Sequence, residues 1–588
     1  MTQSNAKKKI RHSIFTIINK YFPTNFVSFI GYLCPDISVN ESTFRMKNLL
    51  IIFSAAFVLS CSSAKKKDGD SAIEYKNIEK HIAELSSDRY LGRMPLTATE
   101  GITVGYIAEQ MKEIGLEPAN NGSYFQEVPL LAVSSKISNT LDMDTPKGSL
   151  KFDKLVDYVT FSQRMEAGQT LNQSELVFAG FGITAPEYNR DDFQGMDLKG
   201  KTILVFVNDP GYGTSGAYFK GNTMTYYGRW TYKFEEAARR GAKGCLIIHE
   251  TGQAGYPWQV VSNNGESTKL YLNPDNGYMD RCAFEGWISK KAAEQLFSAC
   301  GMSFDQAKKM AVQKDFKPVV LPVKVSGSMN STFETKTSRN VCGMIRGSKH
   351  PDEVVVYTAH WDHLGVGKKV NNDSIYNGAT DNASAVAWML EIARGFKAGL
   401  PPERSVLFLS VTAEESGLLG SYYYAEHPFF PMSKTVACIN TDVMLFLGKF
   451  KDVMLTGSGQ SELDEWVKKE AEKLGRYIAP DPNPENGMYF RSDQFPFVKK
   501  GVPAIYAKGY TDAEKQGKAE TMKIVDRYWK ETYHSPFDEY HPATDDLSGI
   551  VEDAKLLYHV GNELANSEAW PAWNGDSEFK LAREISRK

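Results

Sequence analysis

The sequence lacks the features that would point to nucleic acid or to thiol and serine chemistry. Lys plus Arg number 68 and Asp plus Glu number 71, a formal net charge of -3, and no basic tract carries interleaved aromatic residues. This balance argues against nucleic acid as a partner. None of the seven cysteines lies in a CxxC pair, which disfavours a cysteine-ligated zinc site. No Gly-x-Ser-x-Gly elbow is present to support a serine nucleophile.

The chain also has little that could span a membrane. Its apolar run at residues 49–59 is too short to cross a bilayer as a helix, which takes about 20 residues. The run follows a basic head, Met46-Lys47-Asn48, and ends in small residues, which is typical of a secretory signal peptide. Cys61, directly after Ser60, resembles the lipidated first residue of a bacterial lipoprotein. We therefore expect an exported lipoprotein of the cell envelope, facing the periplasm or the outer surface, with its membrane contact through Cys61.

On this interpretation residues 1–60 form a leader and residues 61–77 a polar tether. A buried hydrophobic segment with a chance cysteine is the alternative. A disulfide between Cys282 and Cys300 is compatible with an oxidising compartment, although their spacing alone is weak support for it.

The length of 588 residues predicts two or more units. Apolar residues recur at helical spacing over 104–114, and Gly115 is well placed to end that helix. Short β-like runs with a helical stretch among them fill residues 135–328 and predict a compact α/β insert. From Asn340 onward, strands such as 354–357 alternate with helices. This alternation predicts an α/β sandwich with its ligand site at the carboxyl ends of the strands.

Five polar clusters follow apolar runs or lie in loops in the second half of the chain. They are residues 358–363 (TAHWDH), 378–382 (GATDN), 412–417 (TAEESG), 440–442 (NTD) and 532–536 (TYHSP). Their histidines and carboxylates are the nitrogen and oxygen ligands that zinc prefers. Two divalent ions about 3.5–4 Å apart repel each other, and a bridging carboxylate offsets that charge. Five such clusters in one α/β unit predict a metal site.

The adjacent residues Glu414 and Glu415 could take different roles at such a site. In extended chain, neighbouring side chains point to opposite sides, so one glutamate can bind metal while the other faces a bound water. Asp362, two residues after His360, could orient that imidazole. Taken singly, these features have plainer explanations. Asp381 before a helix is more often an N-cap, and adjacent glutamates usually mark a solvated helix face.

Longer stretches match a known family. They are LSSDRYLGR, GSYFQEVPL, YTAHWDHLG, NGATDNASA, TAEESGLLGS, NTD, YFRSDQFPFVKKGVPAIY and YHSPFDEY. Through them the sequence resembles the bacterial di-zinc aminopeptidases, which are co-catalytic zinc exopeptidases. The stretches VFAGFGITAPEY, DLKGKTILVF and AARRGAKGCLIIHE look like an inserted protease-associated domain. The resemblance implies a three-layer α/β sandwich with a mixed, mostly parallel sheet. Residues 78–134 and 329–588 would form the peptidase domain, and residues 135–328 the smaller α/β insert.

The resemblance also implies a ligand set. His360, Asp381 and Asp442 would hold one zinc ion. Asp381, Glu415 and His534 would hold the other, so that Asp381 bridges two Zn²⁺ per chain.

Further residues take catalytic roles by the same resemblance. Glu414 would be the general base, taking a proton from a metal-activated water and returning it to the leaving amine. Asp362 would orient the first histidine, and Tyr533 would donate a hydrogen bond to the oxyanion. Arg491 and Asp493 lie in the substrate-side motif without an assigned role.

The function implied is hydrolysis of N-terminal residues from peptides, and three alternatives stay open. A glutaminyl cyclase of similar fold would need only one zinc, whereas His360 and Asp442 favour two. A carboxypeptidase of the same superfamily would need a cationic site for a C-terminal carboxylate, and the sequence does not place its arginines. A non-catalytic, receptor-like scaffold is expected to lose ligands, and here all are present.

We expect a free N-terminus to be required, because an α-amine can reach the metals and the acidic groups near them. C-terminal amidation should matter little, and apolar first residues are expected on the resemblance alone. The insert could cover the cleft and limit substrate length, or it could be a rigid appendage. The sequence does not indicate the preferred residue, the metal used in the cell or the oligomeric state.

Overall fold

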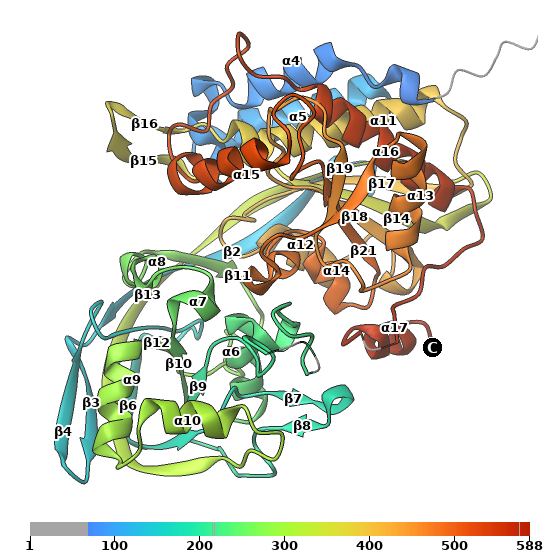
Figure 1. Cartoon of the computed structure of the whole chain (residues 1–588). Helices are drawn as coiled ribbons and strands as arrows, with labels where there is room; N and C mark the ends of the chain where they lie inside the picture. Colours follow the sequence, from blue (N-terminus) through green and yellow to red (C-terminus); the bar gives the residue numbers. More distant parts are fainter. Residues whose placement is uncertain (1–68, 215, 217, 576) are drawn as a thin grey trace, which may run out of the picture. The chain divides into compact units, whose positions relative to one another are not determined.

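The computed structural model describes residues 69–588 except 215, 217 and 576, so the leader and Cys61 lie outside the described residues. Residues 67–588 form one compact unit. It contains a main sheet and a smaller insert, joined by two long strands (Figure 1). In this described part of the chain, no helix combines the length and apolar character that crossing a membrane requires.

The main sheet is mixed and mostly parallel. In spatial order its strands are β13 (Val319–Ile345), β17 (Arg404–Val411), β14 (His350–His360), β18 (Thr435–Asn440), β21 (Ala504–Lys508), β19 (Asp452–Leu455) and β20 (Tyr477–Pro480). Strands β17, β14, β18 and β21 are parallel neighbours, whereas β13 is antiparallel to β17 and β19 is antiparallel to β21. Every residue of β17 and β18 is buried, which explains why their sequences do not alternate between apolar and polar.

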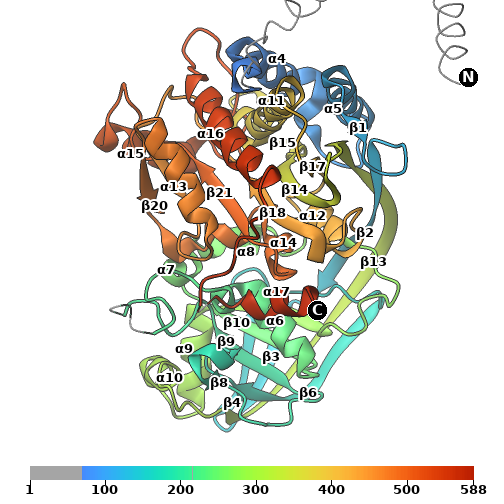
Figure 2. The same cartoon turned by 90° about the vertical axis from the view of Figure 1, so that its right-hand side faces the viewer.

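Helices cover both faces of this sheet, so the predicted three-layer sandwich is confirmed. One face carries α4 (Tyr75–Leu85), α5 (Glu100–Ile114), α11 (Ser384–Ala398), α13 (Leu463–Lys473) and α16 (Ser548–Ala565), as Figures 1 and 2 show. The other carries α12 (Leu419–Glu426) and α14 (Phe495–Lys499). Side chains of β14 alternate between the two faces of the sheet. Val355 packs on the face that carries α11 and α16, and Val356 packs on the face that carries α12 and α14. The predicted end of α5 is also correct, because Gly115 caps it with a left-handed φ of 88°.

The insert is built on a second set of parallel strands. In spatial order these are β6 (Gly168–Phe178), β9 (Thr202–Phe206), β10 (Gly244–His249) and β12 (Phe284–Ser289), with β5 (Tyr158–Phe161) antiparallel to β12 at the edge. Helix α6 (Trp230–Arg239) packs on the face of Ile203, and α9 (Lys290–Ala299) and α10 (Phe304–Ala311) pack on the face of Leu204. This is an α/β unit of the predicted kind. Its identity as a protease-associated domain stays a prediction.

Two long antiparallel strands connect the insert to the main sheet. Strand β2 (Phe125–Ile137) pairs with β13 along its whole length, and the N-terminal part of β13 pairs with β6 of the insert. The boundaries expected at residues 134/135 and 328/329 therefore fall inside β2 and β13. One continuous ribbon passes from one sheet into the other (Figures 1 and 2).

Cys282 and Cys300 do not form the disulfide considered from the sequence. Both are free thiols, as are the other three described cysteines. Cys282 packs with Trp287 on one face of the insert sheet, whereas Cys300 packs against the cluster of Phe297 on the opposite face. The sheet lies between the two thiols, which explains why they are not bonded.

Candidate metal centre

The structure brings the five predicted ligands together with Glu414 at one edge of the main sheet. His360 ends β14, Glu414 and Glu415 follow β17, Asp442 follows β18, Asp381 lies in the turn Ala379–Ala383 ahead of α11, and His534 follows the turn Tyr528–Thr532. Strands β14, β17 and β18 are parallel, so their carboxyl ends meet at the same edge. The alternation of strands and helices therefore predicts the edge of the sheet at which His360, Glu414, Glu415 and Asp442 lie.

One donor group consists of His360, Asp381 and Asp442. Nε2 of His360 lies 3.3 Å from Oδ1 of Asp442 and 3.4 Å from Oδ1 of Asp381. All three residues are buried, and one donor atom from each lies within 4.8 Å of the others. This is the spacing of ligands around a single ion.

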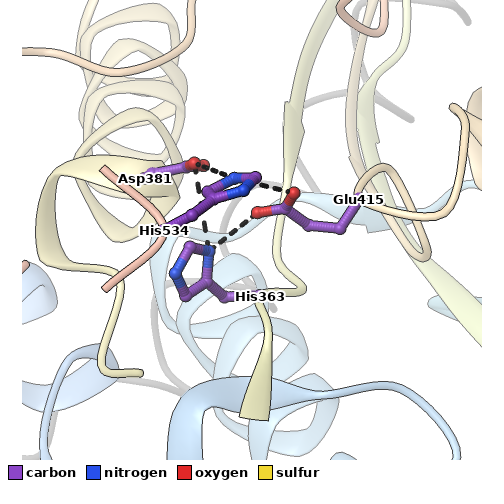
Figure 3. A group of neighbouring side chains, drawn as sticks. All are labelled: His363, Asp381, Glu415 and His534. Carbon is purple, nitrogen blue, oxygen red and sulfur yellow. Dashed lines mark hydrogen bonds and ion pairs between the residues drawn. The ribbon is translucent and has the colours of Figure 1, made fainter. Parts of the chain in front are cut away.

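A second donor group contains Asp381, Glu415, His534 and His363 (Figure 3). Nε2 of His534 lies 3.2 Å from Oδ2 of Asp381 and 3.0 Å from Oε2 of Glu415. His363 Nδ1 lies 2.8 Å from Oε1 of Glu415. Asp381 thus offers one oxygen to each group, as a bridging ligand would. The sequence interpretation missed His363, although it lies in the same TAHWDH cluster as His360.

The geometry around His534 suits a cation. Its Nε2 atom is buried and makes no hydrogen bond, although carboxylate oxygens of Asp381 and Glu415 lie 3.2 and 3.0 Å away. The Nε2 atom of His534 and the carboxylate oxygens of Asp381 and Glu415 converge without hydrogen-bond alignment, as they would around a metal ion. Both donor groups offer the nitrogen and oxygen ligands that zinc takes. The residues present therefore fit metal ions at both positions.

The same crowding of charges perturbs the pKa values of the groups. Burial disfavours the protonated ring of His534, but Glu415 and Asp381 outweigh this and raise its pKa to about 10. Burial raises the pKa of Glu414, and the nearby charge of Asp442 adds to that effect. A cation bound among these groups would displace the proton from His534, because a metal ligand must be deprotonated.

Asp362 contacts the site through two different groups. Nδ1 of His360 lies 3.1 Å from the main-chain carbonyl oxygen of Asp362 and 3.8 Å from its Oδ1. The carboxylate accepts hydrogen bonds from the backbone N–H of Glu414, at 3.0 Å, and of Glu415, at 3.3 Å. The main chain of Asp362 therefore meets the imidazole, while its side chain positions the two glutamates.

Two residues that the sequence interpretation did not single out hold the loop of Asp381. Asp538 is buried and accepts hydrogen bonds from the backbone N–H groups of residues 380–381, both at 3.0 Å. Arg93 is also buried and donates to the main-chain carbonyls of residues 377–378 and of Trp361. Both belong to stretches that carried the family resemblance, LSSDRYLGR and YHSPFDEY. Their side-chain directions could not be read from the sequence.

Unusual backbone conformations aim the ligands inward. Ala413, Val443 and His534 have φ values of 53°, 53° and 54°, in the left-handed region, and each lies at or beside a ligand position. Gly378 has φ 59°, and a Cβ there would lie 2.2 Å from the main-chain oxygen of Asp381. Only glycine fits this position, so Gly378 sets the course of the loop that carries the bridging aspartate.

Four of the five predicted ligands, Asp381, Glu415, Asp442 and His534, line a cleft of about 810 Å³. Glu414 lines it with its carboxylate 4.0 Å from Nε2 of His360. Tyr533 also lines the cleft, and its ring stacks on that of His534 with centroids 3.8 Å apart. Residues of the insert form part of the wall, including Trp230, Tyr256, Val261 and Trp287. The cleft is therefore shared between the two parts of the chain.

Arg491 and Asp493, the two residues without an assigned role, differ in position. Arg491 lines the cleft. Asp493 is buried and accepts a hydrogen bond from the hydroxyl of Ser421 at 2.7 Å.

Comparisons with known proteins match part of this chain to a peptidase family and to aminopeptidases. Residues 340–558 match the sequence model of peptidase family M28. The chain is 36% identical to mouse aminopeptidase NAALADL1 over 24% of its length and 21% of the relative's. It is 38% identical to aminopeptidase YwaD of Bacillus subtilis over 42% of its length and 40% of the relative's. These matches thus span less than half of either relative. A solved aminopeptidase from Aneurinibacillus sp. strain AM-1 is 19% identical, covers 86% of this chain and 97% of its own, and gives a TM-score of 0.45.

Proposed function

We propose that this chain, whose residues 340–558 match peptidase family M28, is a zinc aminopeptidase that removes residues from the N-terminus of peptides. The observation that carries the proposal is the pair of donor groups that share Asp381 in the lining of a cleft. Mouse NAALADL1 and YwaD of Bacillus subtilis are named aminopeptidases, whereas a relative from Caenorhabditis elegans, 24% identical over 81% of this chain, is named a glutamate carboxypeptidase 2 homolog. Two Zn²⁺ per chain is the number that the two donor groups support.

The residues around the donor groups have the chemistry that peptide hydrolysis needs. Zinc bound there would supply Lewis acidity, polarising a carbonyl and lowering the pKa of a water. Within the described part of the chain, no hydrogen bond holds the carboxylate of Glu414, which leaves it available to take a proton from a nucleophilic water. Its raised pKa suits a general base that must later give the proton to the leaving amine. Tyr533 lines the cleft, and its hydroxyl would be the group that donates to a developing oxyanion.

The charged groups that line the cleft favour cleavage at the N-terminus of a peptide. The cleft is lined by Asp381, Glu414, Glu415 and Asp442. Two Zn²⁺ would balance these four charges, and the α-amine of a peptide would then bind there in its neutral form, to a metal ion and beside the carboxylate of Glu414. The presence of His360 and Asp442 beside Asp381 also supports two metals over the single zinc of a glutaminyl cyclase.

Three further features belong to the same proposal. The insert would be a protease-associated domain, and its contribution to the cleft wall supports a role in limiting substrate length. The protein would be an exported lipoprotein held at the membrane through Cys61. Peptides would be its substrates.

A hydrolysis panel tests the function. The purified chain is incubated with aminoacyl chromogenic substrates and with unblocked peptides, with and without a chelator, and products are identified by mass. We expect release of single N-terminal residues, loss of activity with the chelator, and recovery on addition of zinc. N-acetylated peptides should not be cut. Equal cleavage of acetylated and free peptides, or cyclisation of N-terminal glutamine in place of hydrolysis, would refute the assignment.

A further inference from the structure

Arg491 is a cation at the cleft wall that has no anionic partner. Its Nε and Nη2 atoms are buried and make no hydrogen bond, and its guanidinium forms no ion pair with any described residue. The side chain lies against the ring of Tyr256, with 5.7 Å between the guanidinium carbon and the ring centroid. Tyr256 belongs to the insert, so this arginine stands where the insert meets the main domain.

A second unpaired arginine lies nearby. Arg229, in the insert, is buried, and its Nε atom has no hydrogen-bond partner in the described part of the chain. Burial lowers its pKa to about 9, and the charge of Arg491 adds to that shift. Burial likewise lowers the pKa of Arg491. Arginine keeps its charge at neutral pH, so the two guanidinium groups repel each other.

This arrangement is costly in the free protein. A buried charge is normally paired, because taking an ion from water without a partner costs several kcal/mol. By contrast, Lys508, which also lines the cleft, has its ammonium group satisfied by the main-chain oxygens of residues 442–443. Arg491 lines the cleft, so an anion entering it would supply the partner that Arg491 lacks.

We propose that Arg491, supported by Arg229, forms a carboxylate-binding subsite for a short peptide. A guanidinium group binds a carboxylate through two parallel N–H···O bonds, which suits a planar anion better than a neutral carbonyl. The metal ligands and Arg491 line the same cleft. A peptide whose α-amine lies at the metal end can thus reach Arg491 with a carboxylate further along.

The inference deepens the proposed function and rests on it. It names the preferred substrate class as short peptides with a free carboxylate near the cleavage point, such as dipeptides. It also revises the sequence-based expectation that C-terminal amidation matters little, because the sequence could not place the arginines. The carboxylate could come from the C-terminus or from an acidic side chain after the cleaved bond, and the test separates these sources.

The test compares four forms of the zinc-loaded full chain: the parent, Arg491→Gln, Arg491→Lys and Lys530→Gln. Lys530 is an exposed cation that lines the same cleft, so its variant controls for a loss of positive charge alone. Each form is given leucyl-leucine, its C-terminal amide, leucyl-glutamate amide, leucyl-glutamine amide and N-acetyl-leucyl-leucine. Steady-state kcat and KM are measured for each substrate.

The parent should prefer leucyl-leucine to its amide by roughly 10- to 100-fold in kcat/KM, the range for a charged hydrogen-bonded contact, mainly through KM. Arg491→Gln should remove the preference by slowing the acid while leaving the amide unchanged. Lys530→Gln should keep it. A preference for leucyl-glutamate amide over leucyl-glutamine amide, without one for the free C-terminus, would assign the subsite to an acidic side chain.

Equal rates on acid and amide, together with equal rates on the glutamate and glutamine amides, would overturn the inference. So would an Arg491→Gln variant that slows acid and amide alike. The N-acetyl substrate reports separately on the proposed function, since its cleavage would refute an aminopeptidase without touching the acid-to-amide ratio.

Stability separates a binding role from a structural one. Removing an unpaired buried charge should leave the thermal midpoint of Arg491→Gln at or above that of the parent. If this variant unfolds instead, Arg491→Lys serves in its place. The Arg491→Lys variant keeps the positive charge but loses the two parallel N–H donors of the guanidinium group. Its preference for the acid over the amide should therefore be smaller than that of the parent.

Discussion

Arg93 is a buried side chain that supports the candidate metal centre without being one of its ligands. Its loss should therefore lower both the free energy of unfolding and the affinity for metal. It comes from the segment between α4 and α5, far in sequence from the ligands. Its guanidinium donates to four main-chain carbonyls at 2.5–2.9 Å, those of Leu85, Trp361, Asn377 and Gly378. Burial lowers the pKa of Arg93 to about 10, against the opposing charges of Asp381 and Asp538, so it is charged at neutral pH.

The magnitude follows from these four bonds. Arg93→Met keeps much of the volume but removes every donor. Each buried carbonyl left without a donor costs about 1–3 kcal/mol. We take the low end, because the oxygen of Gly378 also accepts from the N–H of Ala383. The expected loss in the free energy of unfolding is then about 4 kcal/mol.

Urea titration followed by tryptophan fluorescence measures this loss, and zinc content is determined on the same samples. Zinc content should also fall in Arg93→Met, because Asp381 lies on the loop that Arg93 anchors. Arg89→Gln is the matched control. Arg89 lies four residues earlier, is 65% exposed and pairs with Glu84 at the surface, so its loss should cost under about 1 kcal/mol. An Arg93→Met protein within 1 kcal/mol of the parent that retains its zinc would refute the reasoning.

Four further predictions concern single residues. Glu414→Gln should keep its zinc and lose roughly 10²- to 10⁴-fold in kcat, and near-normal turnover would remove Glu414 as the base. Asp381→Ala should lose both metal and activity, because one residue serves both donor groups, and metal analysis would reveal any retained ion. Asp538→Asn should weaken zinc binding by about 10- to 100-fold in a chelator competition, and unchanged affinity would mean that its two N–H contacts do not position Asp381. Cys61→Ser should release the protein from membranes on fractionation, whereas an unmodified Cys61 in the intact mass of the parent would refute lipidation.

Much of the fold followed from the sequence because its signals are local. Helix α5 was visible in the spacing of Val104, Ile107, Met111 and Ile114, and its end was visible in Gly115. The buried strands β14 and β17 appeared as continuous apolar runs, and their parallel pairing followed from the helix between them. Since ligands at the ends of parallel strands meet, the position of the metal centre came with the fold.

What the sequence could not supply depends on contacts between distant segments. Arg93 reaches the loop of Asp381 across the interval between residues 93 and 381, and no local pattern marks which arginine does so. His363 lies in the same cluster as a predicted ligand, but its ring direction depends on contacts with distant residues such as Glu415 and His534. We placed the boundaries of the insert where the pattern of apolar and polar residues changes. Strands β2 and β13 continue through these boundaries, because one antiparallel ribbon can belong to two sheets at once.

That ribbon bears on how the cleft selects its substrates. Backbone pairing between β2 and β13 is continuous from Phe125 to Ile137, so the insert is attached by a hydrogen-bonded ribbon and not by a loose linker. Such a ribbon resists bending more than a single strand does. The insert residues Tyr256 and Arg229 should then keep a constant distance from the metal ligands. A carboxylate subsite built partly on the insert would therefore select peptides by length. The amine of a peptide must reach the metal site while its carboxylate reaches Arg491, and the fold sets the distance between these two sites. Longer peptides would place their C-terminus beyond Arg491 and bind without that contact, so length preference and the effect of C-terminal amidation should rise and fall together.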